Sequence, residues 1–396
     1  MSYMFNICVV TGTRAEYHLL MPLMKLIKDD SELNLLLVVT GAHLDAQYGE
    51  TYIDIEKDGF EIDYKIPILT DDDSESGINL AMSNAILGLN KVFKNNRIDM
   101  LILLGDRYEL LSAAIVAMNY KVPICHLHGG ETTEGAIDEC IRHVITKMSY
   151  LHFTSCEQYR NRVIQLGENP ERVYNVGAFG LDNINTFSCM SKEEISKSLN
   201  FDLGERFAVF TYHPVTLGNN EIEQEMKQIL DALDSFKELQ VIFTKSNADA
   251  NGRTINRIIE DYCKTSHKSV FVSSLGMQRY LSCLTNADIV IGNSSSGIIE
   301  TPSFGIPTIN IGDRQKGRIQ GNNIINCKPE YNELVAAIKK ALSKEFIRIA
   351  KTAVNPYGYG GAATKCVSIL KRELKKGIDL KKTFFDINIG AEYENN

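Results

Sequence analysis

The chain has 396 residues, of which 44% are hydrophobic, and a formal net charge of −8 at pH 7. This length and apolar content suit two medium-sized domains with proper cores, and the acidic balance argues against nucleic acid or an anionic membrane as the main partner. The nine cysteines include no C-x-x-C pair, the N-terminus lacks a secretory signal and no apolar run reaches membrane-spanning length, so a cytoplasmic protein with reduced thiols is expected.

Short apolar runs alternate with longer amphipathic segments along the chain, which is the pattern of repeated strand–helix units. The runs are rich in Val, Ile and Leu throughout, as expected of strands buried on both faces of a parallel sheet. The first series comprises residues 5–10, 33–39, 100–104, 123–127 and 151–154, and the second begins near Phe207 and continues through residues 241–244, 270–273, 287–291 and 307–311. The sequence therefore predicts an α/β protein with two Rossmann-like, doubly wound domains.

The segment Gly177–Leu203 separates the two series and is the expected hinge, because it combines glycines with Asn/Ser-rich and polar stretches. Two such domains would face each other across a cleft at the carboxyl ends of their strands, where doubly wound sheets bind ligands. Polar and ionisable residues follow the predicted strands at these ends. We therefore expect the active site in this cleft.

The segment Gly292–Glu300 follows one predicted strand and precedes a helix-like stretch ended by Pro302. A strand that opens through small residues into a helix directs free backbone N–H groups at one spot, which suits a phosphate. Glu300 would lie on the first turns of the same helix, where its carboxylate could accept hydrogen bonds from two ribose hydroxyls. The pairing indicates a nucleotide diphosphate, but a Ser/Gly-rich loop with a helix cap fits this stretch equally well.

The residues at the other strand ends differ in chemical type between the two halves of the chain. Those of the first half are acid and base groups, namely Asp106, His126, His128, Glu131 and Asp138. Arg14, in a glycine turn after the first strand, could bridge two phosphate oxygens. Those of the second half carry phosphate-binding groups: His213, Lys245, the Ser294–Ser296 loop and Arg314. A nucleotide-sugar would place its diphosphate on the second domain and its sugar among the carboxylates, although each residue singly could be a helix cap or a surface charge.

Seven separated motifs occur in order between about residues 6 and 365: GTRAEY, TGAHLDAQYG, LGDRYE, HLHGGETTEGAIDECIRHVITKMS, HPVT, GNSSSGIIETPSFGIPTINIGDRQKGR and NPYGYGGAA. In these motifs the chain closely resembles the hydrolysing UDP-N-acetylglucosamine 2-epimerases of bacterial sialic acid and capsule synthesis. The resemblance implies the GT-B fold, with an acid/base domain of residues 1–180 plus a C-terminal helix at about 370–396, and a UDP-binding domain of residues 181–369. It also implies a homodimer that needs no metal and no cofactor.

The reaction that the resemblance implies converts UDP-N-acetylglucosamine and water into UDP and N-acetylmannosamine. Base removal of the C2 proton with loss of UDP from C1 gives 2-acetamidoglucal; water then adds at C1 while a proton returns to the other face of C2. Asp106 and Asp138 match two acidic catalytic positions of the family. The UDP site would comprise Arg14, His213, Asn247, Ser294, Ser295, Ser296, Glu300 and Arg314, with Ser273 and Leu275 in the main-chain segment that holds the uracil.

Two departures from the family pattern stand out. Many relatives read H-x-E-G-G-E where this chain has residues 126–131, so that their middle catalytic glutamate is His128 here. Either the imidazole transfers the proton, which its ordinary pKa permits, or Glu131 substitutes for it. We favour His128, and relatives in capsule synthesis share this histidine. Leu19 stands where several relatives have a lysine that faces the nucleotide.

Other functions are also compatible with parts of this pattern. His126 and His128 with the two aspartates could form a metal-hydrolase site. A GT-B glycosyltransferase would share the fold and the UDP loop but would not explain the carboxylates of the first domain. A nucleotide-sugar sensor would gain nothing from burying acids around an uncharged sugar. The sugar itself could be a 2,4-diacetamido sugar, which close relatives use, and the nucleotide could be GDP.

Overall fold

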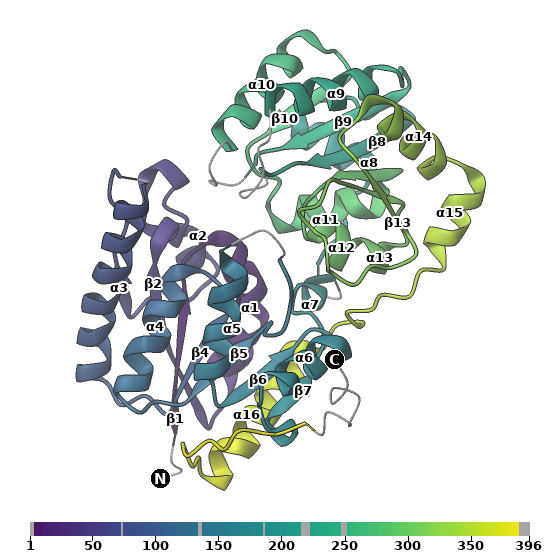
Figure 1. The fold of residues 1–396 in the computed structure, drawn as a ribbon. Coiled ribbons are helices and arrows are strands. Elements are labelled where there is room, and N and C mark those ends of the chain that lie inside the picture. The colour runs from purple at the N-terminus through teal and green to yellow at the C-terminus, as the bar shows by residue number, and fades with distance from the viewer. Residues whose placement is uncertain are drawn as a thin grey trace, which may run out of the picture. The chain divides into compact units, whose positions relative to one another are not determined.

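The computed structural model describes residues 4–72, 74–133, 137–184, 187–214, 222–246 and 252–387. The chain divides into two compact units. The first unit contains the chain up to Glu131, Ile137–Asp182 and everything from Gly360 onward, whereas the second unit is essentially Asn183–Tyr359. Each unit is built around its own parallel sheet, so the expected fold class of two Rossmann-like α/β domains is confirmed (Figure 1).

The sheet of the first unit has seven parallel strands in the order β3-β2-β1-β4-β5-β6-β7. Its strands are β1 (Phe5–Thr11), β2 (Leu33–Thr40), β3 (Tyr64–Ile66), β4 (Met100–Leu104), β5 (Ile124–Leu127), β6 (Leu151–Thr154) and β7 (Val173–Asn175). Its helices are α1 (Arg14–Asp29), α2 (Tyr52–Lys57), α3 (Glu75–Asn95), α4 (Tyr108–Asn119), α5 (Asp138–Met148), α6 (Glu157–Gln165), α7 (Gly180–Ile184) and α16 (Ala362–Lys376).

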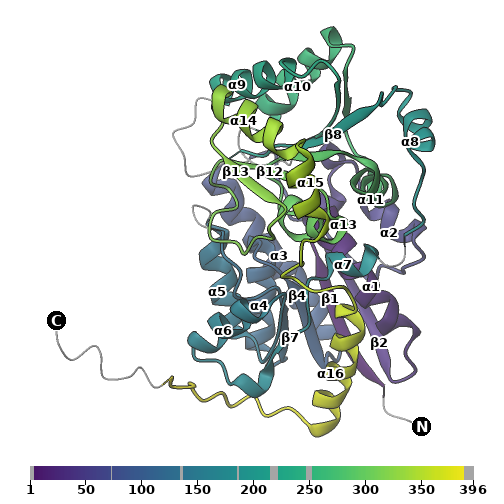
Figure 2. The ribbon, with the colours of Figure 1, turned by 90° about the vertical axis from the view of Figure 1, so that its right-hand side faces the viewer.

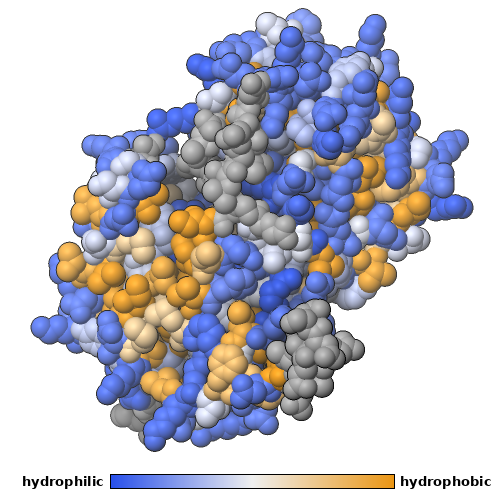
Figure 3. Space-filling model, in the orientation of Figure 1, coloured by the Kyte–Doolittle hydropathy of each residue, from blue (hydrophilic) through white to orange (hydrophobic). Residues whose placement is uncertain are grey.

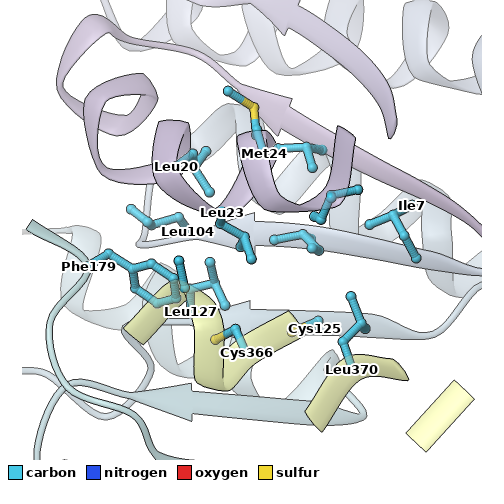
Figure 4. Close-up of a cluster of buried hydrophobic side chains, with 14 of the residues drawn as sticks. Ile7, Leu20, Leu23, Met24, Leu104, Cys125, Leu127, Phe179, Cys366 and Leu370 are labelled. Atoms are coloured by element: carbon cyan, nitrogen blue, oxygen red, sulfur yellow. The ribbon is translucent and has the colours of Figure 1, made fainter. Parts of the chain in front are cut away.

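Side chains of this sheet alternate between two hydrophobic cores, because successive residues of a strand point to opposite faces. Ile7 and Val9 of β1 join the core under α1 and α16, which Figure 4 shows with Leu20, Leu23 and Leu370. Cys8 and Val10 join the other core, under α3, α4 and α5. Burial on both faces explains why these strands are apolar throughout rather than alternating.

The chain returns to the first unit through α16, which packs against α1 (Figure 2). The carboxylate of Asp182 accepts hydrogen bonds from the first two N–H groups of this helix, those of Ala362 at 2.9 Å and Ala363 at 2.7 Å. These N–H groups have no partner inside the helix, so the distant aspartate caps it. Lys371 of α16 also pairs with Asp30 at the end of α1, with 2.7 Å between Nζ and Oδ2.

The sheet of the second unit has six parallel strands in the order β10-β9-β8-β11-β12-β13. They are β8 (Arg206–Thr211), β9 (Leu239–Thr244), β10 (Ser269–Val272), β11 (Ile289–Gly292), β12 (Thr308–Ile311) and β13 (Ile324–Cys327). The helices are α8 (Lys192–Leu199), α9 (Ile222–Asp234), α10 (Gly252–Thr265), α11 (Gly276–Asn286), α12 (Ser296–Ile299), α13 (Thr301–Phe304), α14 (Tyr331–Ala341) and α15 (Lys344–Lys351). Ala208 and Phe210 of β8 face one core, and Phe207 and Val209 face the other.

All ten predicted strands are present, with ends that shift by at most two residues. Three further strands, β3, β7 and β13, were not predicted; they have three or four residues each and lie at the edges of the sheets. Strands this short carry too few apolar residues for a periodic signal. Among the described residues, no helix combines the length and the apolar character that a bilayer crossing requires.

Candidate active site

The carboxyl ends of four neighbouring strands bring the predicted acid and base groups of the first unit to one edge of its sheet. β1, β4, β5 and β6 are adjacent and parallel, so the segments that follow them begin side by side. Arg14 lies exposed at the start of α1, two residues after a glycine turn. Asp106 follows β4, His128 follows β5, and Ser155 follows β6.

Asp106 is held by a buried arginine that has no predicted role. The guanidinium of Arg142 on α5 forms an ion pair with the Asp106 carboxylate, and its side chain is only 3% exposed. Its Nη1 donates to the carbonyl of Glu131 and to Oε2 of Glu139, each at 2.9 Å. Asp138 begins α5 one turn before Arg142, so residues four apart put both groups on one side of the helix. Asp106, Arg142 and the start of α5 thus form one charged cluster.

His128 and Glu131, considered above as alternatives, contact each other. Nδ1 of His128 lies 3.2 Å from Oε1 of Glu131, and Ser155 donates to the same oxygen at 2.8 Å. Nε2 of His128 accepts a long hydrogen bond of 3.5 Å from the N–H of Phe179, whose ring packs beside the imidazole. The carboxylate at Nδ1 favours the tautomer with its proton on Nδ1, so Nε2 carries the lone pair, and the long bond from Phe179 is the contact that a proton or a substrate would have to replace there. The structure therefore indicates a His–Glu pair rather than a choice between the two residues.

The backbone at His128 is strained. Its φ of +63° lies in the left-handed region, which residues other than glycine rarely adopt. Such conformations cost about 1–3 kcal/mol and concentrate at functional sites, where the surroundings hold them in place. Here the two sides of the ring are fixed by Glu131 and Phe179. The conformation directs the side chain of His128 into the buried edge of the sheet instead of into solvent.

His126 is structural. It is fully buried, its Nε2 lies 2.8 Å from the carbonyl of Gly105, and its Nδ1 lies 3.0 Å from Oγ1 of Thr146. Burial lowers the pKa of His126 to about 3. Since both nitrogens are occupied, His126 is a poor metal ligand, and within the described part of the chain no three His, Cys, Asp or Glu residues lie close enough to hold a metal ion. The two hydrogen bonds of His126 argue against its part in the metal-hydrolase alternative.

In the second unit, the loop after β11 has the features of an anion site. Gly292 has a φ of +137°, and a Cβ there would lie 1.8 Å from the carbonyl oxygen of Thr211, so the chain can turn at this place only with glycine. The N–H groups of Ser294, Ser295 and Ser296 donate to no group among the described residues. Three adjacent free donors suit the oxygens of a phosphate.

Glu300 lies at a different place in the helix than expected. It is not on the first turns of one continuous helix but at the junction of α12 and α13. Pro302 does not end the helix, because it occupies the first turn of α13, where no N–H is needed. Oε2 of Glu300 accepts from Ser296 at 2.5 Å, and the hydroxyl of Tyr280 lies 2.5 Å from the same serine oxygen. Burial raises the pKa of Glu300.

Four of the remaining predicted UDP residues, namely His213, Ser273, Leu275 and Arg314, lie in the same unit. Nδ1 of His213 lies 3.2 Å from Oγ of Ser246, and Arg314 donates to the carbonyl of Asn293 at 3.3 Å. Leu275 is buried before α11, while the neighbouring Ser273 is exposed. Asn247 lies outside the described residues.

Four residues described in the two units were given no role from the sequence: Arg142, Ser155, Tyr280 and Asn293. The spacing of Arg142 from Asp138 was a usable signal, because positions i and i+4 share a helix face. The other three are small or aromatic residues that become significant only through contacts across the sheet.

Comparison with known proteins shows the family of the chain. The family model described as UDP-N-acetylglucosamine 2-epimerase matches residues 25–371. A Campylobacter jejuni protein named GDP/UDP-N,N'-diacetylbacillosamine 2-epimerase (hydrolyzing) is 44% identical over 96% of this chain and 99% of that protein. The Escherichia coli polysialic acid biosynthesis protein P7 is 39% identical over 97% of this chain and 98% of that protein.

The solved structures show the same fold. UDP-GlcNAc 2-epimerase from Neisseria meningitidis, crystallised with UDP-GlcNAc, aligns with a TM-score of 0.80 at 17% identity and covers 93% of this chain and 100% of that one. At this identity the likeness concerns the fold, which is the two-Rossmann-domain GT-B type. With a family model that spans most of its length and relatives at 44% and 39% identity, the chain belongs to the UDP-N-acetylglucosamine 2-epimerase family, in its hydrolysing type.

Proposed function

We propose that this protein is a cytoplasmic hydrolysing 2-epimerase whose substrate is a UDP-linked 2,4-diacetamido sugar of the N,N'-diacetylbacillosamine kind. The observation that carries the proposal is the 44% identity, over nearly the whole of both chains, to the Campylobacter jejuni protein named for that activity. The sequence motifs alone favoured UDP-N-acetylglucosamine, with the diacetamido sugar as the alternative. UDP-N-acetylglucosamine is our second candidate, supported by the relative named for polysialic acid biosynthesis at 39% identity.

The first unit supplies the proton transfers in this proposal. Loss of the C2 proton and of UDP from C1 gives a glycal, and addition of water at C1 with a proton to the other face of C2 gives the epimer and balances the reaction. Inversion at C2 needs proton-transfer groups on both faces of the ring. The His128–Glu131 pair supplies one, and the Asp106–Arg142 cluster with Asp138 supplies the other. Arg142 fixes the direction of Asp106 through the ion pair.

The second unit binds the nucleotide. The N–H groups of Ser294, Ser295 and Ser296, which donate to no described residue, suit the diphosphate, as does the guanidinium of Arg314 close by. Glu300 is joined to the same loop through Ser296, where its carboxylate can accept hydrogen bonds from ribose hydroxyls. In this proposal the nucleotide engages the loop after β11 and Arg314 after β12.

Product analysis tests the proposal. The protein is incubated in D₂O with EDTA and with UDP- and GDP-linked diacetylbacillosamine and UDP-N-acetylglucosamine, and the products are followed by NMR. We expect release of UDP and the free C2-epimer carrying deuterium at C2, without any added acceptor, and a higher kcat/KM for the diacetamido sugar. A higher kcat/KM for UDP-N-acetylglucosamine would select the second candidate. Release of no free sugar would contradict both.

We also propose that the protein is a homodimer. Several large apolar side chains are exposed on α3, α4 and the start and middle of α5, where Figure 3 shows a cluster of apolar residues on one face of the first unit. They are Ile78, Leu80, Leu87, Met118, Ile137 and Val144, between 40% and 75% exposed. Apolar patches of this kind mark interaction sites.

Light scattering tests the homodimer. Leu87→Glu should convert the dimer into a monomer, because it places a charge in the apolar face. Val354→Glu, a similarly exposed apolar position in the second unit, is the matched control and should stay dimeric. An unaltered protein that is monomeric at micromolar concentration would contradict the proposal.

A further inference from the structure

Asn293 occupies an unusual position among the segments assigned to the nucleotide. It is 1% exposed and lies between Gly292 and Ser294, directly after β11. Its side-chain amide bonds to both main-chain groups of His213: Oδ1 accepts from the N–H at 2.7 Å, and Nδ2 donates to the carbonyl at 2.8 Å. β8 and β11 are neighbours in the sheet, and the amide links the chain segments that follow these two strands.

The main chain of Asn293 holds a third segment. Its carbonyl accepts from Nε2 of Gln315 at 2.8 Å and from Nη1 of Arg314 at 3.3 Å, and Gln315 is 3% exposed. One residue thus joins the segment after β8, the serine loop after β11 and the segment after β12. Each of these segments carries a residue assigned to UDP.

An amide suits this position. The partly buried main-chain N–H and carbonyl of His213 both need partners, and an amide offers an acceptor and a donor on two separate atoms that can reach both groups at once. Aspartate would face the His213 carbonyl with a second acceptor, and alanine would leave both groups unpaired. Both polar atoms of the Asn293 side chain bond to the main chain of His213, so this side chain acts on the position of His213.

We propose that Asn293 is a positioning residue for nucleotide binding, which acts by fixing the main chain of His213. The inference rests on the proposed function, because it takes His213 as a contact of UDP. Nδ1 of His213 also meets Ser246, whose main-chain N–H in turn donates to Asn256 of α10 at 2.7 Å. His213 itself follows β8. Ser246, which follows β9, contacts its ring, and Asn293, which follows β11, holds its main chain.

A double-mutant cycle on UDP affinity, measured by calorimetry, tests this role. Asn293→Ala and His213→Ala should each weaken UDP by about tenfold, which is the scale of one lost hydrogen bond to a charged group. In the His213→Ala background, Asn293→Ala should cost less than about twofold, because its effect passes through His213. An equal loss in both backgrounds, or no loss at all from Asn293→Ala, would overturn the inference.

Two further variants separate positioning from a general loss of structure. Asn293→Asp keeps the volume and the acceptor for the His213 N–H but loses the donor, so it should fold and still show the same coupling to His213. Asn286→Ala is the control. It removes another side-chain amide that donates to main-chain carbonyls, those of Met190 and Ser282, and it should change UDP affinity by less than about twofold. UDP binding by the unaltered protein is measured first, before any variant. If the unaltered protein does not bind UDP, the proposed function itself is contradicted.

Discussion

Replacement of His128 by glycine should make the protein more stable than replacement by alanine, while both variants lose activity. Both substitutions remove the contacts of the imidazole with Glu131 and Phe179. The difference in stability between the two variants therefore reports the cost of the backbone conformation at residue 128. At a φ of +63° a Cβ costs about 1–2 kcal/mol, which glycine avoids. Glycine in turn costs about 0.4–1 kcal/mol through the greater freedom of its unfolded chain. We therefore expect His128→Gly to exceed His128→Ala by about 1 kcal/mol in the free energy of unfolding.

Urea unfolding followed by circular dichroism measures this difference, since the chain has no tryptophan for fluorescence. Ser155 is the matched control: it also follows a strand, but its φ is not positive, so Ser155→Gly should be less stable than Ser155→Ala. Turnover of both His128 variants should fall at least about 10²-fold, the usual contribution of a general acid or base. An alanine variant as stable as the glycine variant would refute the strain argument, and normal turnover of either would refute the catalytic assignment.

Asp106→Asn should lower turnover by about 10²-fold or more with UDP affinity nearly unchanged in calorimetry, because Asp106 belongs to the proton-transfer groups; a parallel loss of UDP affinity would contradict this. Glu131→Gln should reduce turnover less than Asp106→Asn, since Glu131 supports the imidazole rather than exchanging the proton. Glu300→Ala should weaken UDP much more than pyrophosphate in calorimetry, because only UDP offers ribose hydroxyls; equal losses would mean that Glu300 only braces its loop. Stability should fall as the pH drops from 6.5 toward 3, because the folded pKa of His126 is about 3 and only the unfolded chain takes up the proton. Between pH 6.5 and 5.5 this amounts to about 1 kcal/mol, and His126→Gln should show a smaller slope in urea unfolding at the two pH values.

The sequence by itself determined the fold class, the strands of both sheet centres and the residue types at their ends. Central strands buried on both faces must be apolar throughout, so residues 100–104 and 151–154 were found at their observed bounds. The turn at Gly292 was also predictable from the local sequence, because a tight turn from a strand into a helix requires glycine and small residues. The family motifs then supplied the catalytic and nucleotide roles that the residue pattern left open.

Only the tertiary structure decided which of these residues act together. His128 and Glu131 read as alternatives in the sequence, but two glycines between them bend the chain so that the imidazole and the carboxylate meet. Arg142 reaches Asp106 from 36 residues away, and Asn293 reaches His213 from 80 residues away. Such contacts depend on strand order, which places β4 beside β5 and β8 beside β11. Strand order is set by the packing of whole sheets, and local sequence patterns do not encode it.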